Sequence, residues 1–595
     1  MARNLRVGVQ RGLRQSIGGG LGTGDIFTLS PASFDFSRTN TKDSRITFTR
    51  ASSGAFVGAD GLIKTTSVNF ALNSNSVQGS SIGTPIPSST ASVVSPRGIT
   101  ETVRQLGRDV PAGGAQTWRV GSTSGGTPNT TYTISFFAKT VSGGTTSINV
   151  DINDTAPTDG QATTITGEWT RITKTGGSAN NNLRFFDMNM VTATADFYVW
   201  GAQIEIGTVA TDYIPTTSTI SGAPRFDHDP VTGKSLGLLI EESSTNRNTK
   251  SKSFSNWGVS SGFSLVYDAA TAPDGTTSAT ALDRNGSGLA RLEKNFSVGS
   301  GESTTFSVFA KSVNTTTGRY LRLAVNDAQT GERFADFDLV DGTVDVAATN
   351  GGNFTNADSR IEEYPNDWYR CSISFSKTSS GSENSICFHK LYIRQSNNST
   401  DTPSGVTDVG MHVWGGQVEE KTFPTSLIET DGSTVTRAAD LVEITGTDFS
   451  SFYNQSEGTV FAEYSHAYIE TFSSYAYEFR ADADNRILSL SRFDRQYLGL
   501  VETAGVHETE ISKNTGWVNN QYYKTAFGVA NNNVAMFLDG AQQGSTDTSV
   551  TLPTVNNLSI GRKSDSDARF LDGHIKRIAY FPTRLPDATL QSITS

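Results

Sequence analysis

Carboxylate clusters are the residues of this sequence whose types and spacing come nearest to catalytic chemistry. Retaining glycosidases hold an acid and a nucleophile carboxylate about 5 Å apart, often in a row of the form E-x-D-x-E on one strand. Glu478, Asp482 and Asp484 occur within YEFRADADN, but their spacing leaves the strand pattern and enters a turn. Glu463 and Glu470 are seven residues apart. Neither set forms the row, so the sequence predicts a protein that is not an enzyme and has no catalytic residues.

Nucleophile and zinc motifs lead to the same expectation. The run GVSSG at 258–262 fits G-x-S-x-G, but no helix pattern follows it, as a nucleophile elbow would require. The histidines show no i,i+2 or i,i+4 pairing, and neither HExxH nor CxxC occurs. The six are His228, His389, His412, His466, His507 and His574.

Three aspartates have a second interpretation as ligands of a hard cation. Asp482, Asp484 and Asp539 could bind Ca²⁺ through loop carboxylates. Aspartates in such turns also serve the backbone, and this turn interpretation is favoured. We therefore expect no cofactor, with calcium left open as the alternative.

Exposed aromatic rings are the other candidates, because rings can stack on sugars. Trp118 and Trp257 lack a counterpart in the repeat described below, which makes them the candidate ligand-binding residues. The remaining tryptophans lie inside strand patterns, and we expect them in cores: Trp169 with Trp368, Trp200 with Trp414, and Trp517.

The elements that must position these residues form an internal repeat. Matching segments recur in the same order, and the distance between partners grows along the chain. Loops of a duplicated sandwich tolerate such insertion. The pairs are TYTISFFAK at 131–139 with TTFSVFAK at 304–311, EWTRIT at 168–173 with DWYRCS at 367–372, and YVWGAQIE at 198–205 with HVWGGQVE at 412–419.

Short alternating runs with polar turns fill both copies, which predicts β-sandwiches. Tyr132, Ile134 and Phe136 should share one buried strand face. A third, unrelated series of strands begins near Gly458 and predicts a separate sandwich. The fold class is therefore all-β, with tandem jelly-roll sandwiches and a C-terminal concanavalin A-like sandwich.

Composition narrows the function classes. The formal net charge of −11 argues against nucleic-acid binding. No apolar run approaches the roughly 18 residues of a membrane span. Cys371 and Cys387 both lie in strand-like runs, where two buried thiols are favoured over a disulfide. The basic N-terminus lacks a secretory signal pattern, so we expect release by cell lysis rather than secretion.

Two kinds of segment resemble tailed-bacteriophage structural proteins. RASSGAFVGADGLIKT at 50–65 and PRFDHDPVTGKSLGLLIEESSTN at 224–246 look like a connector that precedes jelly-roll modules similar to carbohydrate-binding modules. The exits at 199–216 and 413–444 share W-G-x-Q-x-E, and the second adds TRAAD. Residues from 458 onward resemble the laminin-G type of concanavalin A-like fold.

The resemblance implies a virion location and a homo-oligomer, in particular a trimer. We expect a short tail fibre or appendage that adheres to host-surface glycan and docks on other virion proteins through its N-terminal segment. Capsid decoration as a head fibre and a polysaccharide depolymerase are the alternatives. The expected organisation is an anchor at 1–24, a connector at 25–67, sandwich 1 at 68–217, a connector at 218–243, sandwich 2 at 244–430, a linker at 431–454 and the last sandwich at 455–595.

Overall fold

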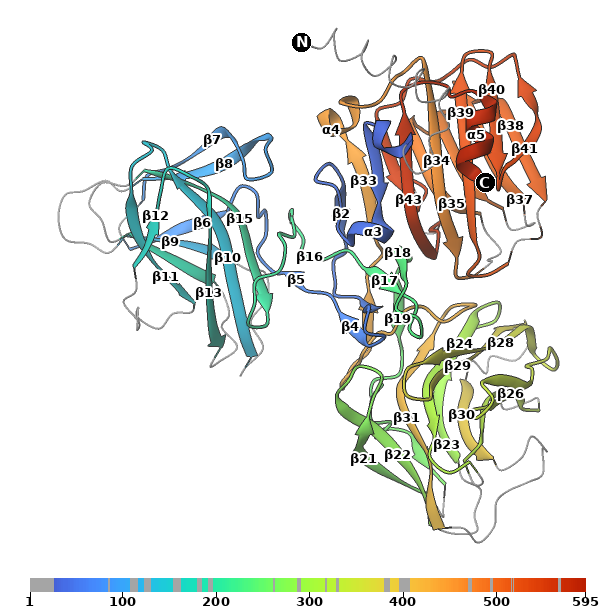
Figure 1. Ribbon diagram of the computed structural model, residues 1–595. Helices are drawn as coiled ribbons and strands as arrows, with labels where there is room; N and C mark the ends of the chain where they lie inside the picture. The colour runs from blue at the N-terminus through green and yellow to red at the C-terminus, as the bar shows by residue number, and fades with distance from the viewer. Residues whose placement is uncertain are drawn as a thin grey trace. The chain divides into compact units, whose positions relative to one another are not determined.

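The computed structural model is an all-β protein whose sheets are built almost entirely from antiparallel neighbours (Figure 1). In the part of the chain that the structure describes, three short α-helices accompany the strands: α3 (Phe36–Thr39), α4 (Gly446–Ser450) and α5 (Asp587–Thr594). Among the described residues no helix is long and apolar enough to span a membrane. The structure describes residues 26–83, 86–107, 116–121, 130–152, 162–178, 185–190, 196–260, 263–285, 291–315, 318–327, 331–378, 386–394, 407–468, 473–492, 496–514, 516, 518–565 and 569–595.

The first sandwich consists of two five-stranded sheets around one apolar core. Tyr132, Ile134 and Phe136 lie together in that core, which confirms the period-two prediction. One sheet has the order β13 (Thr170–Ser178), β10 (Thr130–Thr140), β15 (Phe197–Ile206), β8 (Thr100–Leu106), β7 (Ser88–Val94). The other has the order β12 (Ala162–Ile165), β11 (Thr146–Ile152), β14 (Phe185–Met190), β9 (Gln116–Gly121), β6 (Gly79–Gly83).

The second sandwich repeats both strand orders and adds one edge strand to each sheet, which confirms the duplication. The additions are β27 (Thr343–Val346) and β28 (Phe354–Tyr364); in the first copy residues 166–169 alone make this connection. One sheet runs β21 (Phe263–Thr271), β22 (Thr277–Asn285), β31 (Thr407–Glu419), β24 (Ser303–Ser312), β29 (Trp368–Lys377), β28. The other runs β20 (Gly258–Val259), β23 (Arg291–Ser297), β30 (Ile386–Arg394), β25 (Tyr320–Asp327), β26 (Arg333–Asp338), β27.

The shared W-G-x-Q-x-E exit is a set of buried structural contacts in both copies. Gln203 Oε1 accepts from the Ile214 amide at 2.7 Å, and Gln417 Oε1 accepts from the Ile428 amide at 2.6 Å. The motif glycines have positive φ, and a Cβ on Gly415 would lie 2.8 Å from the Phe309 ring. The motif therefore fixes the path of the chain out of each sandwich.

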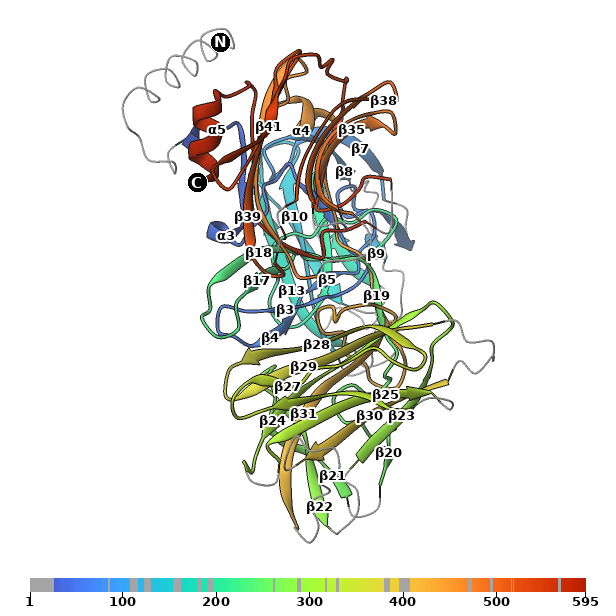
Figure 2. The ribbon, with the colours of Figure 1, turned by 90° about the vertical axis from the view of Figure 1, so that its right-hand side faces the viewer.

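The C-terminal sandwich includes strands from both connector segments. β1 (Ala32–Asp35), β17 (Phe226–His228) and β18 (Ser235–Ile240) join the sheet of β43 (Gly573–Phe581), β34 (Glu457–His466), β39 (Tyr522–Ala530), β40 (Val534–Leu538) and β41 (Ala541–Asp547). The facing sheet includes β33 (Leu441–Thr445), β42 (Asn557–Ile560), β35 (Ser474–Asp482), β36 (Asn485–Ser491), β37 (Gln496–Thr503) and β38 (Val506–Asn514). Figure 2 shows α5 on the outer side of the first of these sheets, where Leu590 and Ile593 pack.

The chain divides into two compact units. One contains residues 48–53 and 66–224 and holds the first sandwich; the other contains residues 1–47, 54–65 and 225–595 and holds the second and C-terminal sandwiches. The basic anchor predicted at 1–24 lies outside the described residues.

Candidate functional site

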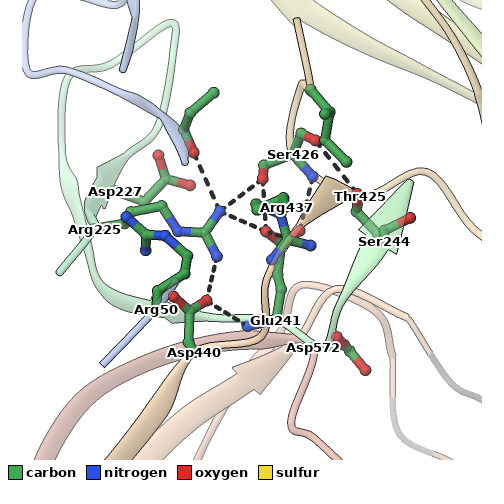
Figure 3. A network of polar contacts seen from close by, with 12 residues as sticks. Arg50, Arg225, Asp227, Glu241, Ser244, Thr425, Ser426, Arg437, Asp440 and Asp572 are labelled. Carbon is green, nitrogen blue, oxygen red and sulfur yellow. Dashed lines mark hydrogen bonds and ion pairs between the residues drawn. The ribbon is translucent and has the colours of Figure 1, made fainter. Parts of the chain in front are cut away.

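A buried ion-pair network ties the second connector to the linker that follows the second sandwich (Figure 3). Arg225 is fully buried, and its Nη1 lies 2.5 Å from Glu241 Oε2 while its Nη2 donates to Asp440. Burial opposes the charge of Glu241, but Arg437 and Arg225 outweigh it and hold the pKa of that carboxyl below its ordinary value. The network thus keeps its charges paired inside the protein.

Hydrogen bonds extend this network into the second sandwich. Ser426 donates its amide to Glu241 Oε1 at 2.7 Å and its hydroxyl to Oε2 at 2.6 Å. Arg437 donates to the Glu242 carbonyl at 2.8 Å. The arginine and the aspartate of TRAAD therefore serve a structural purpose, which is to lock the linker against the connector.

Beside the network lies a cavity of about 420 Å³, here called the junction cavity. Both connector segments, the second sandwich and the C-terminal sandwich contribute to its wall. Apolar side chains such as Ile63 and Leu427 alternate there with polar ones. The polar and neighbouring residues of the wall include Asp227, Asp229, Glu362, Glu363, Tyr364, Arg370, Ser465, Ala467, Tyr522 and His574.

A row of side chains crosses adjacent strands at one end of the C-terminal sheet. Leu239 pairs with His574, His574 with Ser465, and Ser465 with Tyr522 in the strand register. All four line the cavity. Such cross-strand neighbours stand side by side on one face of a sheet. The row therefore presents an imidazole, a hydroxyl and a phenol together.

Asp227 orients this row from the connector. Its Oδ2 lies 2.8 Å from His574 Nε2, and its Oδ1 accepts from the Val57 amide at 2.6 Å. Burial raises the pKa of Tyr522, and a hydrogen bond with Ser465 partly offsets the shift. The Tyr522 hydroxyl also donates to the Leu236 carbonyl at 2.5 Å. These contacts fix the positions of the polar groups.

The added strand β28 supplies two further carboxylates to the cavity wall. Glu362 and Glu363 lie at its end, followed by the buried Tyr364. Burial raises the pKa of Tyr364, and the negative charge of Glu362 adds to the effect. Because the first copy has no strand at this place, this wall is specific to the second sandwich.

The tryptophans proposed as ligand-binding residues belong to the cores, which corrects that expectation of exposure. Trp118 is 4% exposed in the first core, and Trp257 is 4% exposed against Phe254 and Phe306. Conversely Trp169, expected in a core, is only half-buried, and its indole donates to the Val94 carbonyl. The edge strand that covers Trp368 in the second copy has no counterpart in the first. Trp200, Trp368 and Trp414 are buried, and Trp517 lies outside the described residues.

The carboxylates examined for catalysis or calcium do not come together in the described part of the chain. Asp482 accepts from the Asp484 amide at 2.9 Å, and Asp539 accepts from the Lys524 amide at 2.9 Å, as expected of turn residues. Glu478 is buried on β35, where burial raises its pKa. No group of three His, Cys, Asp or Glu suited to a metal occurs among the described residues. Cys371 and Cys387 are buried free thiols.

Sequence reasoning missed the site because its residues are far apart in the chain. The only signals were the repeated acids of FDHD in the connector and the longer offset of the second copy, which marks an insertion. Neither signal shows that Asp227 meets His574, 347 positions later.

Comparisons with known proteins give the fold a context. No family model and no curated protein matches the chain significantly. Similar solved structures include a CBM40 module of a Ruminococcus gnavus sialidase (12% identity, 25% of this chain and 88% of that one, TM-score 0.22). Another is the tandem CBM22 modules of Paenibacillus barcinonensis Xyn10C (12% identity, 59% of this chain and 97% of that one, TM-score 0.21). A third is the mouse laminin α1 domains LG4-5 (8% identity, 54% of this chain and 88% of that one, TM-score 0.17). Scores of this size carry no argument about function.

Proposed function

We propose that this protein is a bacteriophage virion appendage that binds a host-surface glycan in the junction cavity. The observation that supports it is the row of His574, Ser465 and Tyr522, which lines a cavity of about 420 Å³ together with Glu362 and Glu363. That size suits a small saccharide, and oriented donors and acceptors among apolar side chains are typical of ligand sites. A homotrimer would multiply weak contacts through effective concentration.

A steric substitution tests the cavity directly. Ala467 lines the cavity and is half-buried, so Ala467→Phe should occupy ligand space without changing charge. The matched control is Ala541→Phe, an exposed alanine of β41 away from the cavity. Calorimetry of the full chain with host-surface oligosaccharides should show at least about a tenfold affinity loss for the first variant only. Equal binding by both variants, or no binding by the original protein, would contradict the proposal.

The virion location has its own test. Antibodies against the C-terminal sandwich, imaged on intact particles, should label the tail region. Labelling over the capsid would favour the alternative of a decoration protein. An absence of labelling on every particle would refute the virion assignment, whatever the protein binds in solution.

Depolymerisation is the remaining alternative. Incubation of the full chain with capsular polysaccharide or lipopolysaccharide should leave the polymer length unchanged if the cavity only binds. Released oligosaccharides that disappear in a cavity variant such as Asp227→Asn would favour the enzyme instead.

A further inference from the structure

The electrostatic character of the junction cavity is set by carboxylates from two segments. Asp227 and Asp229 come from the second connector, and Glu362 and Glu363 come from β28. Burial raises the pKa of Asp229, but the hydrogen bonds from Thr232 and Val231 together outweigh it and lower that pKa, which keeps the carboxyl ionised. Carboxylates carry negative charge at neutral pH. The wall therefore presents acids from two segments that are distant in the sequence.

The nearby positive charges already have partners; Lys576 Nζ, 3.7 Å from the centroid of the Tyr522 ring, lies 3.8 Å from Glu463 Oε1. Arg370 lines the cavity, but its Nη2 donates to the Thr425 carbonyl at 2.6 Å and to Ser307 at 3.2 Å. Arg225 and Arg437 are paired with Glu241 and Asp440. Each of these three arginines has its Nε buried without a hydrogen-bond partner, but of the three Arg370 alone lines the cavity, where one N–H can serve a neutral sugar oxygen. These arginines therefore do not form a cationic clamp for an anion.

The polar row itself suits uncharged hydroxyl groups. The pairing of Asp227 with His574 leaves a carboxylate–imidazole unit beside the Ser465 hydroxyl and the Tyr522 phenol. Vicinal hydroxyls can both donate and accept, so they can satisfy such a mixed row, whereas a carboxylate or sulfate can only accept. The polar row and the carboxylates consequently both disfavour ligands that carry a carboxylate or a sulfate group.

We propose that the junction cavity selects neutral and amino sugars and rejects acidic glycans. This inference rests on the proposed glycan-binding function and adds the substrate class. An ammonium group on the sugar gains from the carboxylates of β28 and the connector, while an anionic sugar is repelled in a partly desolvated site. Electrostatic discrimination of this kind weakens as salt rises, because ions screen partly exposed charges.

The experiment compares three trisaccharides of matched length on the full chain. The probes are glucosamine, N-acetylglucosamine and galacturonic acid trimers, titrated at low and high sodium chloride. We expect the affinity to fall in that order, with at least about a tenfold difference between the first and the last at low salt. High salt should reduce that difference. Equal or tighter binding of the galacturonic acid trimer would overturn the inference.

Substitutions that remove negative charge test which carboxylates cause the selectivity. The double substitution Glu362→Gln and Glu363→Gln should reduce discrimination between the amino and acidic trimers at least about threefold. Asp345→Asn, an exposed acid of β27 outside the cavity, is the matched control and should leave it unchanged. Unchanged discrimination in the double variant contradicts the inference. If neutral trimers still bind and Ala467→Phe still weakens their binding at least about tenfold, only the inferred selectivity fails. If no trimer binds the original protein, the proposed glycan-binding function fails too.

Discussion

Arg225 and Glu241 form an ion pair of 2.5 Å in which neither side chain is appreciably exposed to solvent. They come from the two ends of a connector segment that contributes β17 and β18 to the C-terminal sheet. Through Ser426 the same pair reaches the second sandwich. The connector is thus part of the folded unit rather than a tether.

Glu241→Gln should destabilise this unit. The substitution leaves the Arg225 and Arg437 guanidinium groups short of negative charge in a buried site, and breaking a buried pair in this way costs about 3–5 kcal/mol. Urea unfolding should show a lower midpoint with an unchanged slope. Glu293→Gln, which breaks a partly exposed pair with Arg291, is the control and should have little effect. A similar midpoint for both variants would mean that the network does not stabilise the fold.

Two equivalent asparagines permit a test of the duplication. Asn69 accepts from the Ala71 and Ile204 amides and donates to two carbonyls, and Asn246 makes the same set with Asn248 and Val418. Substitution by alanine leaves buried backbone groups without partners, which costs about 2–5 kcal/mol.

Calorimetry should resolve which unit each asparagine supports. Asn69→Ala should lower the melting temperature of the unit that contains the first sandwich, and Asn246→Ala that of the other unit. A single transition that responds equally to both substitutions would contradict their independent roles.

The sequence was sufficient for the repeated parts of the fold because they rely on local patterns. Alternation placed Tyr132 and Ile134 on a core face, and comparison of the copies identified Trp200 and Trp414 as buried. Pairs between distant segments leave no such local signal. Nothing in the alternation of Phe226–His228 indicates that the segment extends a sheet whose five strands from β34 onward begin more than 200 residues later.

The junction cavity could not be predicted from the sequence for the same reason, because its wall is formed by distant segments. Glu362 and Tyr364 belong to the cavity wall because the inserted strand β28 carries them there. The polar row in the same wall comes from separate strands of the C-terminal sandwich. The prediction for Trp118 and Trp257 relied on a missing counterpart, but packing in the core can also be specific to one copy. Burial of an aromatic ring depends on the strands that cover it, and those strands are distant in sequence.

Acid should weaken the second sandwich through His389. This ring is buried against Phe296 and Phe306, and burial lowers its pKa from 6.5 to about 3. Between these pH values the unfolded chain binds a proton that the folded chain does not, so the free energy of unfolding falls as pH falls. The expected slope is about 1.4 kcal/mol per pH unit for this residue.

His389→Gln should flatten that dependence, since glutamine can still form a hydrogen bond with Thr304, whose hydroxyl lies 2.8 Å from His389 Nε2. Urea unfolding between pH 7 and pH 4.5 would measure the slope. His507→Gln, at a half-exposed position on β38, is the control and should leave the slope as it was. An identical slope in both variants would assign the acid sensitivity to other groups.

Calcium should not stabilise the C-terminal sandwich through its turn aspartates. Asp482 already accepts from the Asp484 amide and the Asn485 side chain, which accounts for its place in the turn between β35 and β36. A cation that binds only the folded state raises the melting temperature, and the rise grows with the logarithm of its concentration above the Kd. We therefore expect identical melting curves in EDTA and in millimolar Ca²⁺, and a destabilisation by Asp482→Ala that is the same in both. A calcium-dependent rise that Asp482→Ala abolishes would instead assign these aspartates to a metal site.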